Sequence, residues 1–299
     1  MENAFNRRSL LKKVTASAAV ALTTASFNES MGAIEEAGGM ALKGQINHSA
    51  CRWCYSTIPF EDLVKTAKSY GMGSIELTGP TEWDVLKKYG LTSAMGWPEK
   101  WPDKLGLTSC FNDLKNHDTL VALYEDLIPK AAAAGVKNLI TFSGNKNGLS
   151  DEQGLLNCKK GLQRIMKTAE KHDVMITMEL LNSRVDHKDY QCDNTEWGAV
   201  LCEMVGSDKF KLLYDIYHMQ IMEGDLIATI KRNQQYISHY HTGGVPGRHE
   251  INSSQEINYP AVMKAIVDTG YKGFVGQEFI PTWADKLAAL KEGITICDI

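Results

Sequence analysis

The feature that most constrains the fold of this chain is a regular alternation between short apolar segments and longer segments of helical period, beginning near residue 44. The short segments, which we expect to be strands, are 44–50, 73–79, 91–97, 136–144, 174–182, 210–218, 236–244 and 274–280. The expected helices are 59–71, 81–90, 118–135, 151–173, 196–206, 225–233, 259–270 and 283–298. Uninterrupted alternation of this kind favours parallel strands. Eight such units predict an α/β protein with a (β/α)8 TIM barrel.

A doubly wound open sheet is the competing architecture. It is disfavoured because no G-x-G-x-x-G sequence follows the first expected strand. The 299-residue chain also shows no internal repeat, low-complexity tract or flexible linker within the alternating region. We therefore expect one barrel domain over residues 41–299.

The first forty residues differ in character from the rest. A basic segment, 6–13, is followed by a short, mildly apolar run, 14–27, that is too short to span a bilayer. The pair Arg7 and Arg8 resembles a twin-arginine export signal. We expect residues 1–40 to be a signal peptide and linker, and the protein to be exported to the periplasm. A tail with incidental charges is the alternative.

Composition narrows the range of partners. The net charge is −4, and no lysine- or arginine-rich block occurs beyond the N-terminus, which argues against nucleic acid as a partner. The seven cysteines are odd in number and irregularly spaced, so they do not form a disulfide framework. We expect a small-molecule substrate and no membrane association after signal removal. A homo-oligomer is compatible with the sequence.

Four metal-competent residues end four successive expected strands. They are Glu179, Asp215, His241 and Glu278, separated by 36, 26 and 37 residues, about one βα unit each. That spacing brings all four to the rim of a barrel where active sites lie. A single strand-end glutamate is usually a cap or an ion-pair partner, but four such residues in consecutive units indicate a site. Three carboxylates and one imidazole suit a divalent ion such as Mn²⁺, Mg²⁺ or Co²⁺.

Further polar residues are expected around this set. His218 follows Asp215 by three residues, which predicts an imidazole in the loop beside the carboxylate. The Gly- and Pro-rich turn 241–250 delivers Arg248, whose guanidinium suits a substrate with a carboxylate or several oxygens. Asn182 either orients a substrate oxygen or caps the next segment.

These segments resemble the hydroxypyruvate isomerase group of the xylose isomerase-like TIM-barrel superfamily, over essentially the whole chain after residue 48. The matching segments are CRWCY (51–55), MELLN (178–182), YDIYHMQ (214–220), HYHTGGVPGRHEIN (239–252) and YKGFVGQEFIPT (271–282). The resemblance implies that Glu179 and Glu278 are paired catalytic glutamates and also metal ligands. It implies that Asp215 and His241 complete the metal set, and that His218 and Arg248 bind substrate. Hydroxypyruvate isomerases tend to carry glutamine at the position of His241, whereas ketose epimerases use histidine.

The chemistry expected of two glutamates beside a metal is proton removal next to a carbonyl, through a metal-stabilised enediolate. One glutamate takes the proton and the other returns it, which would convert hydroxypyruvate to tartronate semialdehyde or isomerise a related sugar. A ketose 3-epimerase or an inosose dehydratase-like sugar enzyme would use the same residues. A non-catalytic sugar-binding protein is the third alternative, although it would not require both glutamates.

The sequence CRWCY raises two further interpretations, a redox pair and half of a zinc site. A thioredoxin-like pair should open a helix, whereas Arg52 and Trp53 separate these cysteines and the expected helix begins near Pro59. A zinc site needs a second ligand pair at suitable spacing, and none follows. We therefore interpret Trp53, together with Arg52 and Tyr55, as pocket wall or substrate contact, with buried thiols beside them. Simple packing at the barrel mouth is the alternative.

Overall fold

The computed structural model describes residues 40–299. The signal peptide and linker predicted for residues 1–40 lie, except for Met40, outside the described residues. Among the helices of the described part, none has the length and apolarity needed to cross a membrane.

Seven parallel strands form one curled sheet in the order β2-β1-β7-β6-β5-β4-β3. The strands are β1 (Asn47–Cys51), β2 (Ser74–Glu76), β3 (Asn138–Thr141), β4 (Met175–Glu179), β5 (Phe210–Asp215), β6 (Ile237–Thr242) and β7 (Phe274–Gln277). Each falls within an expected segment or overlaps its end. The predicted TIM-barrel fold is confirmed by this sheet and its surrounding helices.

The eighth expected strand, 91–97, does not form a regular strand, but it fills the position between β2 and β3. Its backbone pairs with β2 through Thr92 and with β3 through Gly96, in isolated parallel bridges. The Ser74 hydroxyl accepts from a backbone N–H of this segment and the Ser93 hydroxyl donates to one of its carbonyls, so side chains replace part of the ladder. The barrel therefore closes through an irregular segment.

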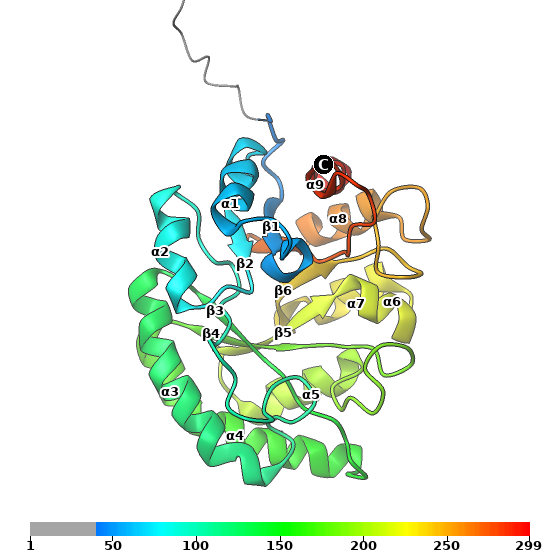
Figure 1. The fold of residues 1–299 in the computed structure, drawn as a ribbon. Coiled ribbons are helices and arrows are strands. Elements are labelled where there is room, and N and C mark those ends of the chain that lie inside the picture. The colour runs from blue at the N-terminus through cyan, green and yellow to red at the C-terminus, as the bar shows by residue number, and fades with distance from the viewer. Residues whose placement is uncertain (1–39) are drawn as a thin grey trace, which may run out of the picture. The chain divides into compact units, whose positions relative to one another are not determined.

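The helices stand around the strands in chain order, as Figure 1 shows. In the described part they are α1 (Phe60–Ser69), α2 (Pro80–Lys88), α3 (His117–Ala134), α4 (Asp151–His172), α5 (Thr195–Val205), α6 (Ile216–Met222), α7 (Leu226–Asn233), α8 (Tyr259–Asp268) and α9 (Lys286–Cys297). Three short 3₁₀ helices are η1 (Arg52–Tyr55), η2 (Leu114–Asn116) and η3 (Gln234–Tyr236). The sequence pattern predicted all of these α-helices except α6, which is too short to show a period.

Polar side chains fix where several helices begin. Ser150, Asn194 and Asp285 each accept a hydrogen bond from a backbone N–H of the first turn of α4, α5 and α9. At the other end of α3 and α5, Gly135 and Gly206 take left-handed backbone conformations that end the helix. These local signals set the lengths of the loops that lead to and from the strands.

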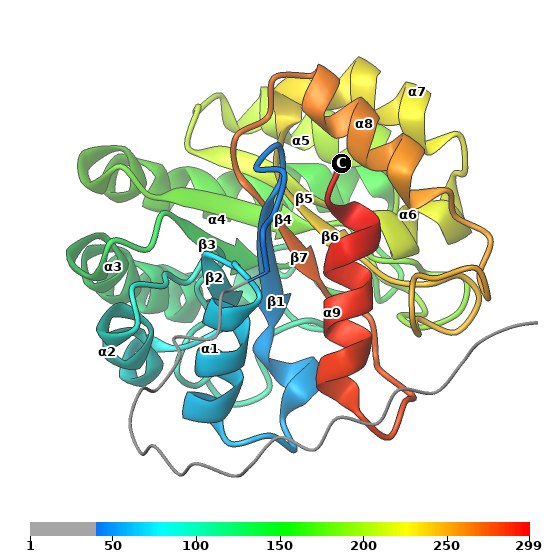
Figure 2. The same cartoon turned by 90° about the horizontal axis from the view of Figure 1, so that it is seen from above.

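The start and the end of the barrel meet. Both carboxylate oxygens of Asp298 accept hydrogen bonds from the backbone N–H of Lys43, at 3.1 and 2.9 Å. Figure 2 shows the blue β1 and the red α9 side by side, which agrees with this contact. The chain is thus closed on itself at the end of the last helix.

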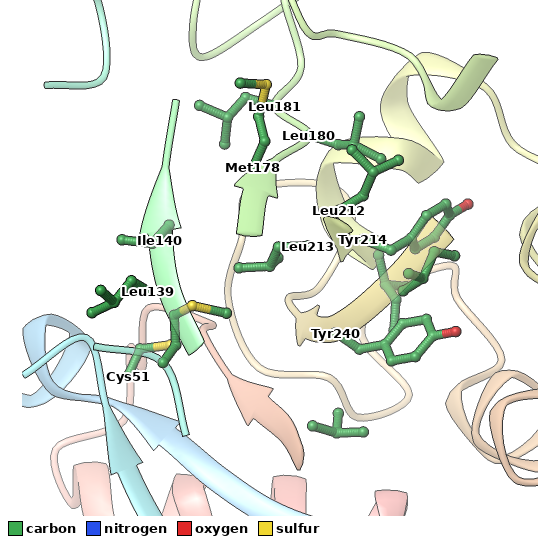
Figure 3. Packing of buried hydrophobic residues seen from close by; sticks show 14 of the residues in the cluster. Cys51, Leu139, Ile140, Met178, Leu180, Leu181, Leu212, Leu213, Tyr214 and Tyr240 are labelled. Carbon is green, nitrogen blue, oxygen red and sulfur yellow. The ribbon is translucent and has the colours of Figure 1, made fainter. Parts of the chain in front are cut away.

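Alternation along the strands separates apolar from polar side chains. Tyr214 and Tyr240 project towards the helices, with ring centroids 6.2 Å apart, and Figure 3 shows them packed with Leu212 and Leu180. Because successive side chains of a strand point to opposite faces, Asp215 and His241 point the other way, into the barrel. The apolar core therefore lies between sheet and helices, and the barrel interior carries polar groups.

Candidate active site

The four residues predicted as a metal set come together at the carboxyl ends of β4 to β7. Glu179 and Asp215 end β4 and β5, His241 lies in β6, and Glu278 directly follows β7. One ligand atom from each lies within 4.8 Å of all the others. All four are almost completely buried, between 0% and 4% exposed. Parallel strands in register place their ends at one rim, which is why separate segments converge here.

The histidine faces two different groups through its two nitrogens. Its Nδ1 atom lies 2.8 Å from Oε2 of Glu278 and 3.4 Å from Oε1 of Glu179. Its Nε2 atom lies 2.6 Å from Oε1 of Glu76, at the end of β2. The side of His241 that faces Glu179 and Glu278 is therefore Nδ1.

Several buried polar atoms at this point have no hydrogen-bond partner. They are Oε1 of Glu179, Oδ2 of Asp215 and Nε2 of His218. Buried carboxylate oxygens without partners are costly. A divalent cation satisfies such oxygens, and oxygen-rich sets with one imidazole suit Mn²⁺, Mg²⁺ or Co²⁺. The residues present therefore fit the metal that the sequence predicted, while the identity of the ion stays a prediction.

The two glutamates occupy unequal electrostatic environments. Burial raises the pKa of Glu179, and the neighbouring charge of Glu278 raises it further. Burial also acts to raise the pKa of Glu278, but His241 and Arg248 beside it bring that pKa well below its usual value. The pKa of Asp215 is raised well above its usual value by burial, which Arg248 only partly offsets. Pairs of carboxyl groups with divergent pKa values are typical of acid–base sites.

Arg248 reaches this cluster from the loop after β6. Its Nη2 atom donates to Oε2 of Glu278 at 2.7 Å and lies 3.6 Å from Oδ2 of Asp215. The guanidinium carbon lies 5.3 Å from the ring centroid of Trp53 and 5.5 Å from that of Tyr217. Two aromatic rings and two carboxylates therefore hold the predicted substrate-binding arginine over the predicted metal set.

The structure corrects the predicted position of His218. The sequence pattern placed it in a loop, but it lies in the first turn of α6, where its backbone N–H donates to the side chain of Asp215 at 2.9 Å. Asp215 is thus both a predicted ligand and the N-cap of α6. Capping explains why the histidine stays next to the carboxylate, since the cap fixes the first turn.

Asn182 lies behind His218. Its Oδ1 atom accepts hydrogen bonds from the backbone N–H groups of Val185 and Asp186, so its Nδ2 must face Nδ1 of His218, at 2.6 Å. Nδ1 of His218 then accepts, and the proton lies on Nε2, which points to Asp215 at 3.9 Å. Of the two roles considered for Asn182, these contacts match capping, with the addition that it orients His218.

The CRWCY segment forms the last residue of β1 and η1. Trp53 is 40% exposed and donates from Nε1 to Oε1 of Glu278 at 2.8 Å, which places it at the site as expected. Arg52 points instead to Glu82 and to the ring of Phe60, and Tyr55 is fully buried. Of the two interpretations, pocket contact and simple packing, Arg52 and Tyr55 match packing, because of this segment only Trp53 lines the cavity.

The thiols agree with their interpretation from the sequence. Cys51 and Cys54 are buried and not bonded to each other, and all seven cysteines of the chain are free and buried. Burial raises the pKa of both Cys51 and Cys54 well above the usual value. Neither a redox pair nor a paired-cysteine zinc site finds support in these contacts.

A cavity of about 260 Å³ opens above the predicted metal set. Its floor includes Glu179, Glu278 and Arg248, and its wall is mostly apolar. The wall residues that sequence reasoning missed are Leu77, Trp97, Leu107, Phe142, Leu181 and His187. Most of them lie in loops or at the ends of expected elements, where no periodic pattern marks a cavity-facing side chain. Only the tryptophan and phenylalanine content near residues 97–101 and 142 could have suggested an aromatic wall.

Glu76 is a further residue near the site that the sequence analysis did not identify. It is completely buried, and its Oε1 accepts from Nε2 of His239 at 2.7 Å as well as from His241. The usable signal was its position within an expected strand, 73–79, as Glu179, Asp215 and Glu278 lie within theirs. It was overlooked because a long stretch of chain separates it from the run of successive units that begins at Glu179.

Comparison with known proteins places these features in a family. The family described as xylose isomerase-like TIM barrel matches residues 64–296. The hydroxypyruvate isomerase of Escherichia coli (strain K12) is 32% identical over 152 residues, covering 50% of this chain and 58% of that protein. The D-psicose 3-epimerase of Enterocloster bolteae is 27% identical over 230 residues, covering 70% and 72%. These matches confirm the predicted resemblance to hydroxypyruvate isomerases.

Among solved structures, the chain is similar to the AP endonuclease, family 2, of Brucella melitensis, with a TM-score of 0.73 and 23% identity. That match covers 82% of this chain and 97% of the other, and it supports the fold alone. The relatives named as hydroxypyruvate isomerases or putative hydroxypyruvate isomerases are matched over only 35% to 58% of their own length.

Proposed function

Because the chain belongs to the xylose isomerase-like TIM barrel family, we propose that it is an enzyme that isomerises or epimerises a small hydroxy-carbonyl compound. Hydroxypyruvate, converted to tartronate semialdehyde, is the first candidate substrate. The observation that carries the proposal is the pair Glu179 and Glu278, which lie on the floor of one cavity in unequal environments. Acid–base exchange of a carbon-bound proton needs such a pair.

The residues that would hold the cofactor are Glu179, Asp215, His241 and Glu278. A divalent cation bound there supplies positive charge that stabilises an enediolate as it develops from the substrate. Since the four residues are nearly fully buried, the chain itself excludes water from this charge.

The protein's own groups move the proton. Glu179 and Glu278 both line the cavity. Burial and the charge of Glu278 raise the pKa of Glu179, whereas His241 and Arg248, against the effect of burial, lower the pKa of Glu278, so the two carboxyl groups differ in how strongly they hold a proton. One would take the proton from carbon and the other would return it. After one exchange the roles reverse. The proton leaves one carbon and returns to its neighbour in an isomerisation, or to the opposite face in an epimerisation.

Substrate orientation is assigned to Arg248 at the cavity and to His218 beside Asp215. Arg248 provides a guanidinium for a carboxylate or for several oxygens, and Nε2 of His218, which is buried next to Asp215, has no hydrogen-bond partner. Trp53 adds an aromatic wall and keeps Oε1 of Glu278 in place. These contacts favour a substrate whose oxygens are concentrated at one end.

A ketose 3-epimerase is the second candidate. His241, which ketose epimerases use where hydroxypyruvate isomerases tend to carry glutamine, favours it. The match to a D-psicose 3-epimerase also covers more of this chain than the match to the E. coli hydroxypyruvate isomerase. An inosose dehydratase-like reaction and non-catalytic sugar binding are separated from these two by the same experiment.

The test is proton exchange in D₂O followed by NMR, with Mn²⁺ or with EDTA, across hydroxypyruvate, ketoses and inosose. We expect deuterium to enter the carbon next to the carbonyl of one substrate, with Mn²⁺ only. Loss of water from inosose would identify a dehydratase. Binding without exchange would identify a sugar-binding protein, and no exchange with any compound would refute the enzymatic proposal. Glu179→Gln and Glu278→Gln provide the matched inactive controls.

The proposal also includes export to the periplasm by the twin-arginine route, on the basis of Arg7 and Arg8. Residues 1–40 fused to a folded reporter should direct it to the periplasm. Replacement of both arginines by lysine should retain it in the cytoplasm, and equal export of the two fusions would refute this part.

A further inference from the structure

A second buried polar cluster lies on the far side of His241 from the predicted metal set. Its centre is Glu76, the last residue of β2, which is 0% exposed. Oε1 of Glu76 lies 2.6 Å from Nε2 of His241 and 2.7 Å from Nε2 of His239. The rings of the two histidines lie 5.2 Å apart, nearly perpendicular. One carboxylate oxygen is therefore shared by two imidazoles from the same face of β6.

These distances place a proton on Nε2 of His241. A carboxylate oxygen only accepts, so both Nε2 atoms must donate to Oε1 of Glu76. Nδ1 of His241 also faces carboxylates, Glu278 at 2.8 Å and Glu179 at 3.4 Å, so without a cation it too has an acceptor for a proton. A cation held by these carboxylates would displace that proton, and the hydrogen bond to Glu76 would then leave the remaining proton on Nε2 and the lone pair of Nδ1 directed at the cation. Nδ1 of His239 has no partner, which suits an unprotonated nitrogen better than an N–H group.

A second metal ion at this cluster would have to displace its hydrogen bonds. Cys51, Glu76 and His241 offer three metal-competent atoms. However, Oε1 of Glu76 already lies at direct hydrogen-bond distance from both Nε2 atoms. Sγ of Cys51 is 3.6 Å from Nε2 of His241 and adds only a weak contact.

The backbone of β7 makes room for this arrangement. A Cβ atom at Gly276 would lie 2.6 Å from Oε1 of Glu76 and 2.9 Å from Cδ2 of His241. The space of one methyl group is thus occupied by the carboxylate and the imidazole. Glu76 therefore packs between Gly276 of β7 on one side and His239 and His241 of β6 on the other.

We propose that Glu76 is a positioning residue for the metal centre, which fixes His241 with the proton on Nε2 and with Nδ1 directed at the two glutamates of the predicted metal set. His239 holds Glu76 in turn by its own hydrogen bond. The proposal rests on the metal part of the proposed function. Hydrogen-bond partners behind a ligating histidine typically change metal affinity by about 10–100-fold when they are removed.

The first test compares the wild-type chain with Glu76→Gln by calorimetric titration with Mn²⁺. This substitution replaces the carboxylate by a neutral amide, which removes the negative charge that holds the proton on Nε2 of His241 and allows an N–H group to face that nitrogen, so that the proton moves to Nδ1 and blocks the ligand atom. We expect the Kd for Mn²⁺ to rise about 10–100-fold. Asp298→Asn, which changes a buried carboxylate at the end of α9, should leave the Kd unchanged. An unchanged Kd in a folded Glu76→Gln protein would overturn the proposal, whatever its thermal stability.

The second test needs no substitution of Glu76. In protein labelled with ¹⁵N-histidine and loaded with Mg²⁺ or Zn²⁺, two-bond NMR correlations report which ring nitrogen is protonated. We expect His241 to carry the proton on Nε2, with His241→Gln identifying its signal. A proton on Nδ1 would overturn the proposal, as would a second bound ion that is lost in Cys51→Ala. If the wild-type chain binds no divalent ion, the metal part of the proposed function fails, which is distinct from an unchanged Kd in the variant.

Discussion

Replacing Asp215 by asparagine should make the metal-free protein more stable while abolishing its response to metal. Oδ2 of Asp215 is buried without a hydrogen-bond partner, and burial raises the pKa of this carboxyl group well above its usual value. At neutral pH its charge therefore opposes folding when no cation is bound. Asparagine keeps the shape, and as a good N-cap it keeps the hydrogen bond from the backbone N–H of His218.

The magnitudes follow from these contacts. Leaving a buried neutral polar group unsatisfied costs about 1–3 kcal/mol, and a charged group costs more. Because asparagine leaves a neutral Nδ2 where Asp215 leaves a charged Oδ2, Asp215→Asn should raise the free energy of unfolding in EDTA by about 1 kcal/mol. In the wild-type protein, Mn²⁺ at about one hundred times its Kd should add about 2.7 kcal/mol, because it binds only the folded state. In the variant this gain should be nearly absent, since one of four ligands is lost.

Urea unfolding at pH 7, in EDTA and in MnCl₂, measures both effects. Asp298→Asn is the matched control, because both oxygens of Asp298 accept hydrogen bonds from Lys43. It should be destabilised in both buffers and keep the full response to Mn²⁺. The reasoning would be refuted if Asp215→Asn were less stable than the wild type in EDTA, or if it retained the gain in MnCl₂.

Three further predictions concern the glutamates and their neighbours. Glu179→Gln and Glu278→Gln should each lower kcat by about 10²–10⁴-fold in the D₂O exchange assay, and a loss of only a few-fold would contradict the two-base scheme. Trp53→Phe removes the N–H that donates to Glu278 at 2.8 Å but keeps an aromatic ring. Steady-state kinetics should show a kcat/KM about tenfold lower, and an unchanged kcat/KM would contradict the assigned contact. Glu250 accepts hydrogen bonds from the backbone and hydroxyl of Thr282, and although burial opposes it, these donors hold the pKa of Glu250 below its usual value. The contribution of Glu250 to the free energy of unfolding is therefore complete above the unfolded-state pKa of about 4.3, and it is lost as the pH falls through the folded-state pKa. Glu250→Gln should accordingly show a smaller loss of stability between neutral and acid pH than the wild type. Parallel stability–pH curves for the two proteins would refute this prediction.

The fold was largely predictable because a βα unit has a strong local signature. Seven of the eight expected strands form, and α6 is the only α-helix of the described part that the pattern missed. The eighth strand failed because hydrogen bonds by the Ser74 and Ser93 side chains replace ladder bonds, and such exchanges leave no period in the sequence. The position of His218 was misjudged for a related reason, since a single capped turn looks like a loop.

The metal set was predictable because strand ends in a parallel barrel share one rim. Spacing of one unit between Glu179, Asp215, His241 and Glu278 sufficed to bring them together. The position of Trp53 at the cavity was also predictable, whereas Arg52 and Tyr55 in the same segment follow the packing alternative. Whether a side chain in a tight turn faces the cavity depends on one or two backbone angles, which the sequence does not reveal.

The sequence by itself determined the barrel and the four residues that meet at one rim of it, because both follow from local periodicity and from the equivalence of parallel strand ends. Only the tertiary structure decided how those residues are held. It turned Asn182 towards His218, stacked Arg248 between Trp53 and a second ring, and placed Glu76 behind His241. These contacts join segments from different strands and loops, and their formation depends on the closure and twist of the whole barrel. No local pattern carries that information, since each contact needs two parts of the chain to be folded at once.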